Sequence, residues 1–278
     1  MDWSAEAKKE LSRVPFFVRS RVRARVEEEA AASGASVVEP LHLELSKGKF
    51  LSRLSSEVRG YRVEQCFGPS RCPNRAADSA PLAGEIESLL LEKDVLGFLQ
   101  RSLGREKVKP HHEFRVSISE CPNACSRPQI FDLGIIGAAV PEAGNAECTR
   151  CGACEEICRE HAISLDGGGV LICAEKCLQC GQCIDVCPTG KIFAAGHGFR
   201  IQIGGRLGRH PHLARELSGL YSQGDVLWVL ERCVDLFLSQ DRGGVKRFAY
   251  VLDGYGADRF IHELESSLKG SRSYLTAI

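Results

Sequence analysis

The sequence predicts an α/β protein in which a short cysteine-rich segment interrupts the main domain and a small helical module precedes it. Three observations predict this organisation. Apolar residues alternate with polar ones over residues 114–118 and again over 199–203, the pattern of half-buried strands. Residues 226–237 instead carry apolar side chains at helical spacing. Between these segments, eight of the fourteen cysteines lie within residues 148–187.

The eight clustered cysteines repeat one spacing, Cys-x2-Cys-x2-Cys-x3-Cys. Three thiolates on such a tight loop can hold one four-iron cluster, while the fourth cysteine reaches a second cluster. Disulfides and zinc are the alternatives, but nothing at the N-terminus resembles a signal peptide. We therefore expect one [4Fe-4S] cluster on Cys148, Cys151, Cys154 and Cys187, and another on Cys177, Cys180, Cys183 and Cys158.

Composition excludes several classes of protein. The 278 residues are enough for about two domains of ~150 residues each, and a hydrophobic content of 44% is ordinary for a globular protein. Thirty-six basic and thirty-six acidic residues cancel, so no overall field would attract nucleic acid. No apolar stretch approaches the ~20 residues that a membrane helix needs. We expect a cytoplasmic protein without membrane insertion, where cysteines act as ligands.

Four further cysteines form two pairs outside this cluster of eight. Cys66 and Cys72 are one pair, and Cys121 and Cys125 are the other. Neither pair can complete a four-iron cluster alone, but together they supply four thiolates, with glycines and prolines that favour tight turns beside them. We infer a third [4Fe-4S] cluster on these four residues.

The second set resembles a known family. Cys-x-Gly-x3-Cys, followed after about fifty residues by Cys-Pro-Asn-x-Cys and then Asp-Leu-Gly-Ile, is similar to the iron-sulfur and sirohaem half of sulfite and nitrite reductases. The resemblance implies that Cys125 bridges the cluster to a sirohaem iron, where a small oxyanion is reduced. A ferredoxin segment placed after Asp132–Gly137 is similar to that of dissimilatory and anaerobic sulfite reductase subunits.

These resemblances imply a domain division. We expect a sirohaem-reductase-like α/β domain made from residues 46–141 and 195–278, with a two-cluster ferredoxin insert at 142–194. Residues 1–45 form a helical pattern with a start at Pro15 and resemble a short domain of a protochlorophyllide reductase subunit. Four arginines crowd its polar side and are either a solvated face or a docking site for anionic groups: Arg19, Arg21, Arg23 and Arg25.

Two groups of basic residues are candidates for cofactor or substrate binding. The glycine-rich turn at 204–210 is either only a turn or a site for tetrapyrrole carboxylates, through Gly204, Gly205, Arg206, Arg209 and His210. Arg115 and His112 precede Cys121 and could neutralise and protonate an oxyanion at iron, although a histidine at the start of a strand is commonly a surface feature.

The sequence leaves two functions open. Only about twenty residues separate the helical module from Cys66, so the half that usually completes the sirohaem pocket is absent or replaced. The chain is therefore either a sulfite- or nitrite-reductase-like enzyme or an electron-transfer subunit without its own substrate site. Both require an electron donor protein or partner subunit, and the chain could form an oligomer. Of the other cysteines, Cys173 and Cys233 are expected in the core, and a helix is expected at 82–101.

Overall fold

A computed structural model describes residues 1–14, 16–56, 58–68, 72–167, 169–240 and 245–268. The chain divides into two compact units. One consists of Met1–Arg59 with Lys107–Pro110, and the other of Gly60–Glu106 with His111–Ile278.

In its described residues, the first unit contains three helices and a pair of two-residue parallel strands: β1 (Asp2–Trp3), α1 (Ala5–Ser12), α2 (Phe16–Ala32), β2 (Val37–Val38) and α3 (Pro40–Ser56). Its core includes Trp3, Leu11 and Val26. The indole of Trp3 donates a hydrogen bond to Glu27, 2.7 Å away, and Arg23 pairs with the same carboxylate at 3.0 Å. The predicted helix start at Pro15 lies outside the described residues.

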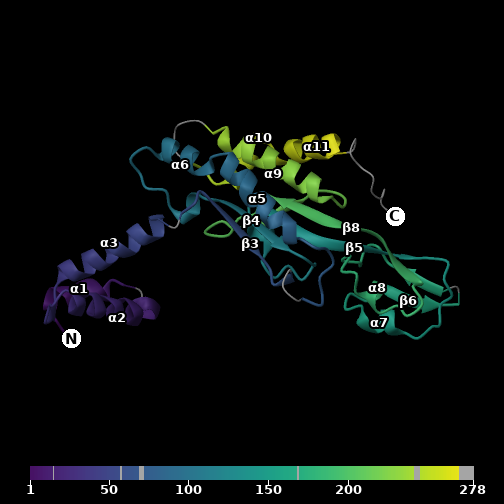
Figure 1. Ribbon diagram of the computed structural model, residues 1–278, viewed down its shortest axis with the longest axis horizontal. Helices are drawn as coiled ribbons and strands as arrows, with labels where there is room; N and C mark the ends of the chain where they lie inside the picture. Colours follow the sequence, from purple (N-terminus) through teal and green to yellow (C-terminus); the bar gives the residue numbers. More distant parts are fainter. Residues whose placement is uncertain (15, 57, 69–71, 168, 241–244, 269–278) are drawn as a thin grey trace. The chain divides into compact units, whose positions relative to one another are not determined.

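A five-stranded mixed sheet forms the centre of the second unit, in the order β3-β4-β5-β8-β9 (Figure 1). The first three strands are parallel, and the last two join antiparallel. Their bounds are β3 (Tyr61–Gln65), β4 (Phe114–Ser119), β5 (Leu133–Ala143), β8 (Ile192–Ile203) and β9 (Arg215–Glu216). The strands predicted at 114–118 and 199–203 are therefore present, and the mixed α/β class is confirmed.

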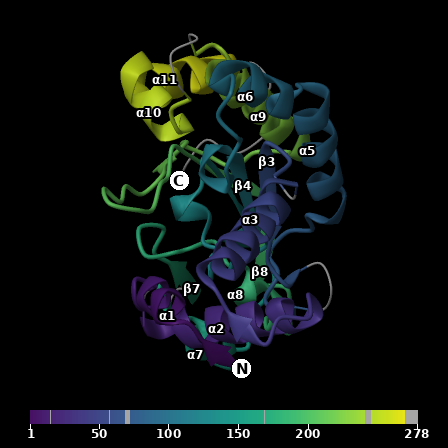
Figure 2. The same ribbon diagram turned by 90° about the vertical axis from the view of Figure 1, so that its left-hand side faces the viewer.

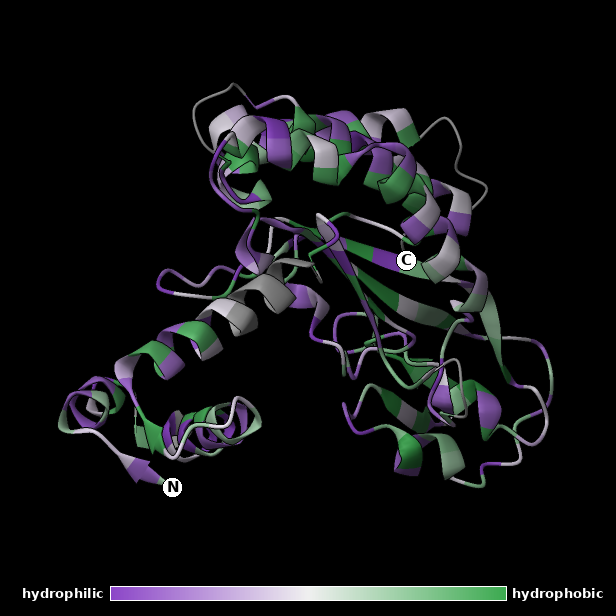
Figure 3. Ribbon diagram, turned by 60° about the vertical axis from the view of Figure 1, so that its left-hand side comes forward, coloured by the Kyte–Doolittle hydropathy of each residue, from purple (hydrophilic) through white to green (hydrophobic). Residues whose placement is uncertain are grey.

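Helices cover one face of this sheet (Figures 1 and 2). They are α5 (Ala80–Glu92), α6 (Val95–Leu103), α9 (Gln223–Leu238), α10 (Phe248–Tyr255) and α11 (Ala257–Leu268), with short 3-10 turns at η1 (Pro110–His112) and η2 (Pro128–Ile130). Apolar residues run along the strands beneath them (Figure 3). Phe114 of β4 lies at the centre, with its ring 5.5 Å from that of Phe237 and 5.4 Å from that of Phe248.

The helix predicted at 82–101 is two helices, and this expectation was wrong. The chain breaks at Asp94, whose φ of 48° is left-handed and incompatible with a continuous helix. The same aspartate then accepts a hydrogen bond from the Gly97 amide and caps α6. The predicted helical stripe at 226–237 is confirmed, because it lies within α9.

A small segment lies between β5 and β8. It consists of α7 (Ala153–Ile157), a hairpin of β6 (Ile163–Asp166) and β7 (Gly169–Ile172), and α8 (Gln182–Asp185). β5 and β8 pair from Leu133 with Ile203 to Ala143 with Ile192, so the segment is carried on a two-stranded antiparallel ribbon. In the described part of the chain, no helix is long and apolar enough to cross a membrane.

Replacing Phe114 by alanine should lower the free energy of unfolding by about 3–5 kcal/mol, because it leaves a cavity between β4, α9 and α10. Urea denaturation of the two proteins measures this difference. Leu91→Ala is a control, since Leu91 is 71% exposed and its loss should change the unfolding free energy by no more than about 0.5 kcal/mol. Equal losses for both variants would contradict the assignment of Phe114 to the core.

Candidate metal centres

The parallel pairing of β3 with β4 brings the two separate cysteine pairs together. Cys66 directly follows β3, and Cys121 lies two residues beyond β4. Gln65 pairs with Ile118, and the Cys66 amide donates to the Ile118 carbonyl at 3.0 Å. Because neighbouring parallel strands end at the same edge of a sheet, both cysteines lie at the carboxyl edge, a common position for ligand sites in α/β proteins.

The other three cysteines of this set lie close enough to Cys121 to act on its pKa. Burial raises the pKa of Cys121, and the neighbouring Cys125, Cys72 and Cys66 raise it further. Cys121 is buried, whereas Cys125 is exposed. The set therefore has an inner side within the protein and an outer side at Cys125.

Glu120, which the sequence analysis did not single out, organises this edge. Its amide donates to the Cys66 sulfur at 3.3 Å, and its side-chain Oε1 accepts from both the amide and the hydroxyl of Ser79 at 2.8 Å. Its carbonyl accepts from the Ala76 amide at 2.7 Å. One residue thus joins the end of β4 to the chain on both sides of Cys72, and its position directly before Cys121 was the only signal in the sequence.

The first cysteine set of the small segment surrounds one cavity. Cys148, Cys151, Cys154 and Cys187 all line it. The first three come from one loop, and Cys187 comes from the second loop, beyond α8. Four thiol sulfurs are the donor set that a [4Fe-4S] cluster needs, and the ligation of one cluster by these four cysteines stays a prediction.

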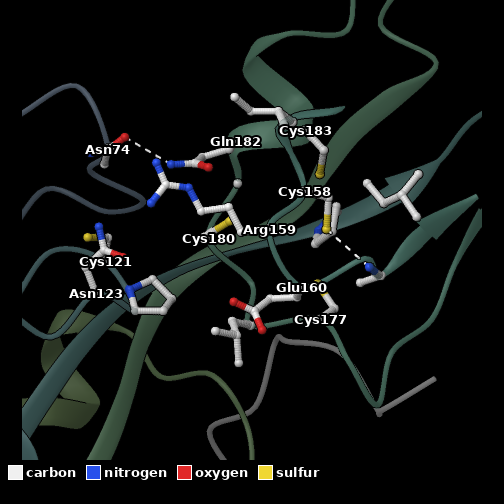
Figure 4. Close-up of a pocket in the computed structure, with 17 residues that line it drawn as sticks. Asn74, Cys121, Asn123, Cys158, Arg159, Glu160, Cys177, Cys180, Gln182 and Cys183 are labelled. Carbon is white, nitrogen blue, oxygen red and sulfur yellow. Dashed lines mark hydrogen bonds between the residues drawn. The ribbon is translucent and has the colours of Figure 1, made fainter. Parts of the chain in front are cut away.

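The second set lines another cavity together with residues of the sheet edge (Figure 4). Four of the lining residues are Cys158, Cys177, Cys180 and Cys183 of the small segment. Others come from the chain after β3 and β4, namely Asn74, Cys121, Pro122 and Asn123. Arg159 and Gln182 also line it. The structure therefore places the second cysteine set directly beside Cys121.

Burial raises the pKa of these thiols, whereas hydrogen bonds from backbone amides lower it. Burial raises the pKa of Cys154 and Cys177, and raises that of Cys183 to about 12. At Cys187, burial acts in the same direction but is outweighed by amide donors, including that of Ile192 at 3.4 Å, so its pKa is lowered. Iron binding at the buried thiols would thus have to release protons.

The two remaining cysteines differ from each other. Cys233 is fully buried on α9, as expected. The expectation that Cys173 belongs to the core was wrong, because Cys173 is exposed. It follows the end of β7, and its amide donates to the Ala162 carbonyl at 2.7 Å. Cys173 follows an apolar run but is not buried with it, because one side of a two-stranded hairpin faces solvent.

Arg115 lies near the start of β4, whereas Cys121 lies beyond its end, roughly 20 Å along the strand at 3.3 Å per residue. Its guanidinium donates to the Ile130 carbonyl at 3.1 Å and lies 3.7 Å from Asp132. His112 precedes the strand, in edge contact with His111 at 4.2 Å. The structure thus brings Arg115 to internal partners and does not bring it to Cys121.

The glycine-rich turn lies at the same end of the sheet as Arg115. It follows β8, and the Gly204 amide donates to the Asp132 carbonyl at 2.9 Å. Arg206 pairs with Asp253 at 3.0 Å and stacks on the Tyr250 ring at 4.4 Å. A side chain at Gly205 would meet the carbonyls of Gln129 and Phe131, so this glycine is required by backbone packing. Of the remaining turn residues, Arg209 and His210 are exposed.

Two family models match this chain. The nitrite and sulphite reductase 4Fe-4S domain matches residues 59–271. The model described as the proto-chlorophyllide reductase 57 kD subunit matches residues 3–47.

Curated relatives and a solved structure are also similar. Coenzyme F420-dependent sulfite reductase of Methanocaldococcus jannaschii is 30% identical over 70% of this chain and 31% of that protein. One of the subunits of the anaerobic sulfite reductase of Salmonella typhimurium is 29% identical over 38% of this chain and 26% of that protein. This chain therefore spans about a third or less of those relatives. The crystal structure of dissimilatory sulfite reductase I superimposes with a TM-score of 0.49 and 14% identity, over 79% of this chain and 56% of that one.

Asp132 should give the protein a measurable pH dependence. Burial raises its pKa from 3.8 to about 6, against the opposing effect of Arg115 and Arg247. The folded chain therefore holds this proton more tightly than the unfolded chain, and the stability so contributed is lost as the pH rises from about 4 to about 6.

Asp132→Asn removes this titration. The free energy of unfolding of the variant should therefore fall less than that of the wild type as the pH rises from about 4 to about 6. Urea unfolding of both proteins at intervals from about pH 4 to pH 7 measures the two slopes. An unchanged slope in the variant would show that Asp132 titrates alike in the folded and unfolded chains and would contradict the raised pKa.

Proposed function

Because this chain belongs to the nitrite and sulphite reductase family, through a 4Fe-4S domain at residues 59–271, we propose that it is an iron-sulfur oxidoreductase that conducts electrons to a reduction site. The observation that carries the proposal is the second cavity, in which four cysteines of the small segment and Cys121 line one space. Its lining supports a chain of redox centres that runs from the small segment to the sheet edge.

We assign three [4Fe-4S] clusters to the three cysteine sets. The first is held by Cys148, Cys151, Cys154 and Cys187, the second by Cys158, Cys177, Cys180 and Cys183, and the third by Cys66, Cys72, Cys121 and Cys125. The clusters would supply one-electron carriers. Backbone amides donate hydrogen bonds to the sulfurs of Cys66, Cys158, Cys177 and Cys187, and such bonds would help to tune the reduction potential of a bound cluster.

In the proposed domain division, the ferredoxin insert is residues 142–194, the reductase domain is 46–141 with 195–278, and the helical module is 1–45. The match of residues 3–47 to a separate family model supports a distinct N-terminal module. In that module Arg19 donates to the Ser12 and Val14 carbonyls, and Arg25 lies 3.2 Å from Glu29. These internal bonds favour the solvated-face interpretation for both arginines.

A sirohaem bridged by Cys125 is the proposed site for reduction of a small oxyanion such as sulfite or nitrite. The exposure of Cys125 supports this, because its sulfur can face a further group outside the protein. The proposed carboxylate-binding residues fit less well, since Arg206 is already neutralised by Asp253 and Arg115 is bonded to Ile130. We therefore derive no step of the reduction from these arginines.

The ion pair of Arg206 with Asp253 favours a second candidate function, because it leaves Arg206 less suited to bind a cofactor carboxylate. In this second candidate, the chain is an electron-transfer subunit and the reduction site lies on a partner. The name of the Salmonella relative, a subunit of anaerobic sulfite reductase, is consistent with a partner chain. In either case an electron donor protein would act at the insert, where Cys151 is exposed.

The deciding experiment is a combined count of iron, sulfide and tetrapyrrole on the full chain, purified without oxygen from cells that make sirohaem. About thirteen irons, twelve in the clusters and one in an extractable tetrapyrrole with a haem absorption band, support the enzyme. About twelve irons without tetrapyrrole support the electron-transfer subunit. A protein that binds about eight irons or fewer after reconstitution would contradict the assignment of three clusters.

The crossed grouping has a test of its own. Cys187→Ala should remove about four irons, because Cys187 completes the first set despite its place in the second loop. Cys173→Ala is the matched control and should keep the full iron content, since Cys173 lines neither cavity. Iron analysis after identical reconstitution measures both, and equal losses would contradict the grouping.

A further inference from the structure

The two-stranded ribbon of β5 and β8 carries the small segment, but the ribbon alone does not fix the position of this segment relative to the sheet edge. Ser119, the last residue of β4, pairs with Ile136, so β5 and β8 continue beyond the neighbouring strand as a two-stranded ribbon. The pairing shifts register between Val140 and Pro141. Such a bulge bends and twists a ribbon locally. Contacts other than the ribbon must therefore fix where the second cysteine set lies relative to Cys121.

Some of these contacts join the second cysteine loop to the ribbon itself. The Ala139 amide donates to the Gln179 carbonyl at 2.8 Å. Gly181 has a φ of 77°, and a Cβ there would lie 3.0 Å from the Ala139 Cβ, so the loop approaches the strand closely. Ile184 packs against Ala139 and Cys121. The contacts of Gln179 and Gly181 are with the ribbon, whereas Ile184 also reaches the apolar cluster that contains Cys121.

One side-chain bond joins the loop to the other side of the site. The Gln182 side-chain amide donates to Asn74 Oδ1 at 3.0 Å, across 108 residues of sequence (Figure 4). Asn74 lies two residues after Cys72, and Gln182 directly precedes Cys183. Both side chains line the cavity that also contains Cys121. The bond therefore links a loop of the third cysteine set to a loop of the second.

We propose that Asn74 and Gln182 are a positioning pair that holds the second ferredoxin cluster at a fixed separation from the third cluster. The inference rests on the proposed function. In the step concerned, one electron leaves the reduced second cluster, which is oxidised, and enters the third cluster, which is reduced, while no bond forms or breaks.

The chemistry of the pair suits this role. Two amides are uncharged, so their bond sets geometry without adding a charge that would shift the reduction potential of either cluster. Arg159, which lines the same cavity, would act on the potential instead. Electron transfer through protein falls steeply with distance, so a bond that closes the gap between two loops acts on the rate.

The test uses the full chain, reconstituted with iron and sulfide and reduced without oxygen by titanium(III) citrate. Electron paramagnetic resonance detects the splitting and broadening that neighbouring reduced clusters impose on each other. Asn74→Ala and Gln182→Ala should each diminish this interaction while the iron content stays at the wild-type value. Electron transfer to the third cluster, measured by rapid mixing, should be slower in each variant than in the wild type, because the rate falls steeply as the separation of two clusters increases.

Two further variants make the result specific. The exchange Asn74→Gln with Gln182→Asn keeps the combined length of the two side chains and should restore the interaction. Asn145→Ala removes an exposed amide from the connection before the first cysteine set and should leave the spectrum unchanged.

The outcomes separate the inference from the function on which it rests. Wild-type coupling in both alanine variants would overturn the positioning pair, as would an exchange variant that stays uncoupled. Loss of iron in the alanine variants would also overturn it, by showing a role in cluster assembly. A wild-type protein that cannot hold the second and third clusters would overturn the proposed function together with the inference.

Discussion

The parallel pairing of β3 with β4 is the constraint on which the site depends. Cys66 and Cys121 are separated by more than fifty residues, yet they meet because each follows one of two adjacent strands that run in the same direction. A parallel pair needs a crossover, here supplied by α5 and α6. These helices are anchored to the far side of the core, where Phe98 of α6 contacts Phe237 of α9 at 5.9 Å. Packing of the helical layer thus maintains the spacing of the thiols.

The same edge also receives the small segment, for a related reason. β5 runs parallel to β4, so its carboxyl end leaves the sheet beside Cys121, and β8 returns along it. Any segment inserted between these strands starts and ends at the edge where the third cysteine set lies. His197 of β8 further ties this ribbon to the chain after Cys72, through a 3.2 Å contact between its Nδ1 and the Ala76 carbonyl. The topology therefore brings a segment inserted between β5 and β8 close to the third cysteine set.

Local patterns in the sequence predicted local structure well. Thiolate ligation requires short spacings, so the cysteine motifs alone indicated the groups that line the two cavities, and alternation indicated strands β4 and β8. Features that depend on distant residues were not predictable. The break at Asp94 needs a left-handed backbone in a residue other than glycine. Cys173 is exposed because it lies on the side of the hairpin that faces solvent, and the sequence does not show which side that is. The bond between Asn74 and Gln182, and the engagement of Arg115 by Ile130, exist only once separate segments pack together.

Anomalous X-ray scattering at the iron edge, from crystals of the full chain grown without oxygen, tests the central claim most directly. The account predicts three iron sites, each enclosed by one of the three cysteine sets, with the second site between the first and the one at Cys121. It also predicts that Cys187 ligates the first site and Cys158 the second. Iron at only two sets, or a third site away from the ends of β3 and β4, would contradict it.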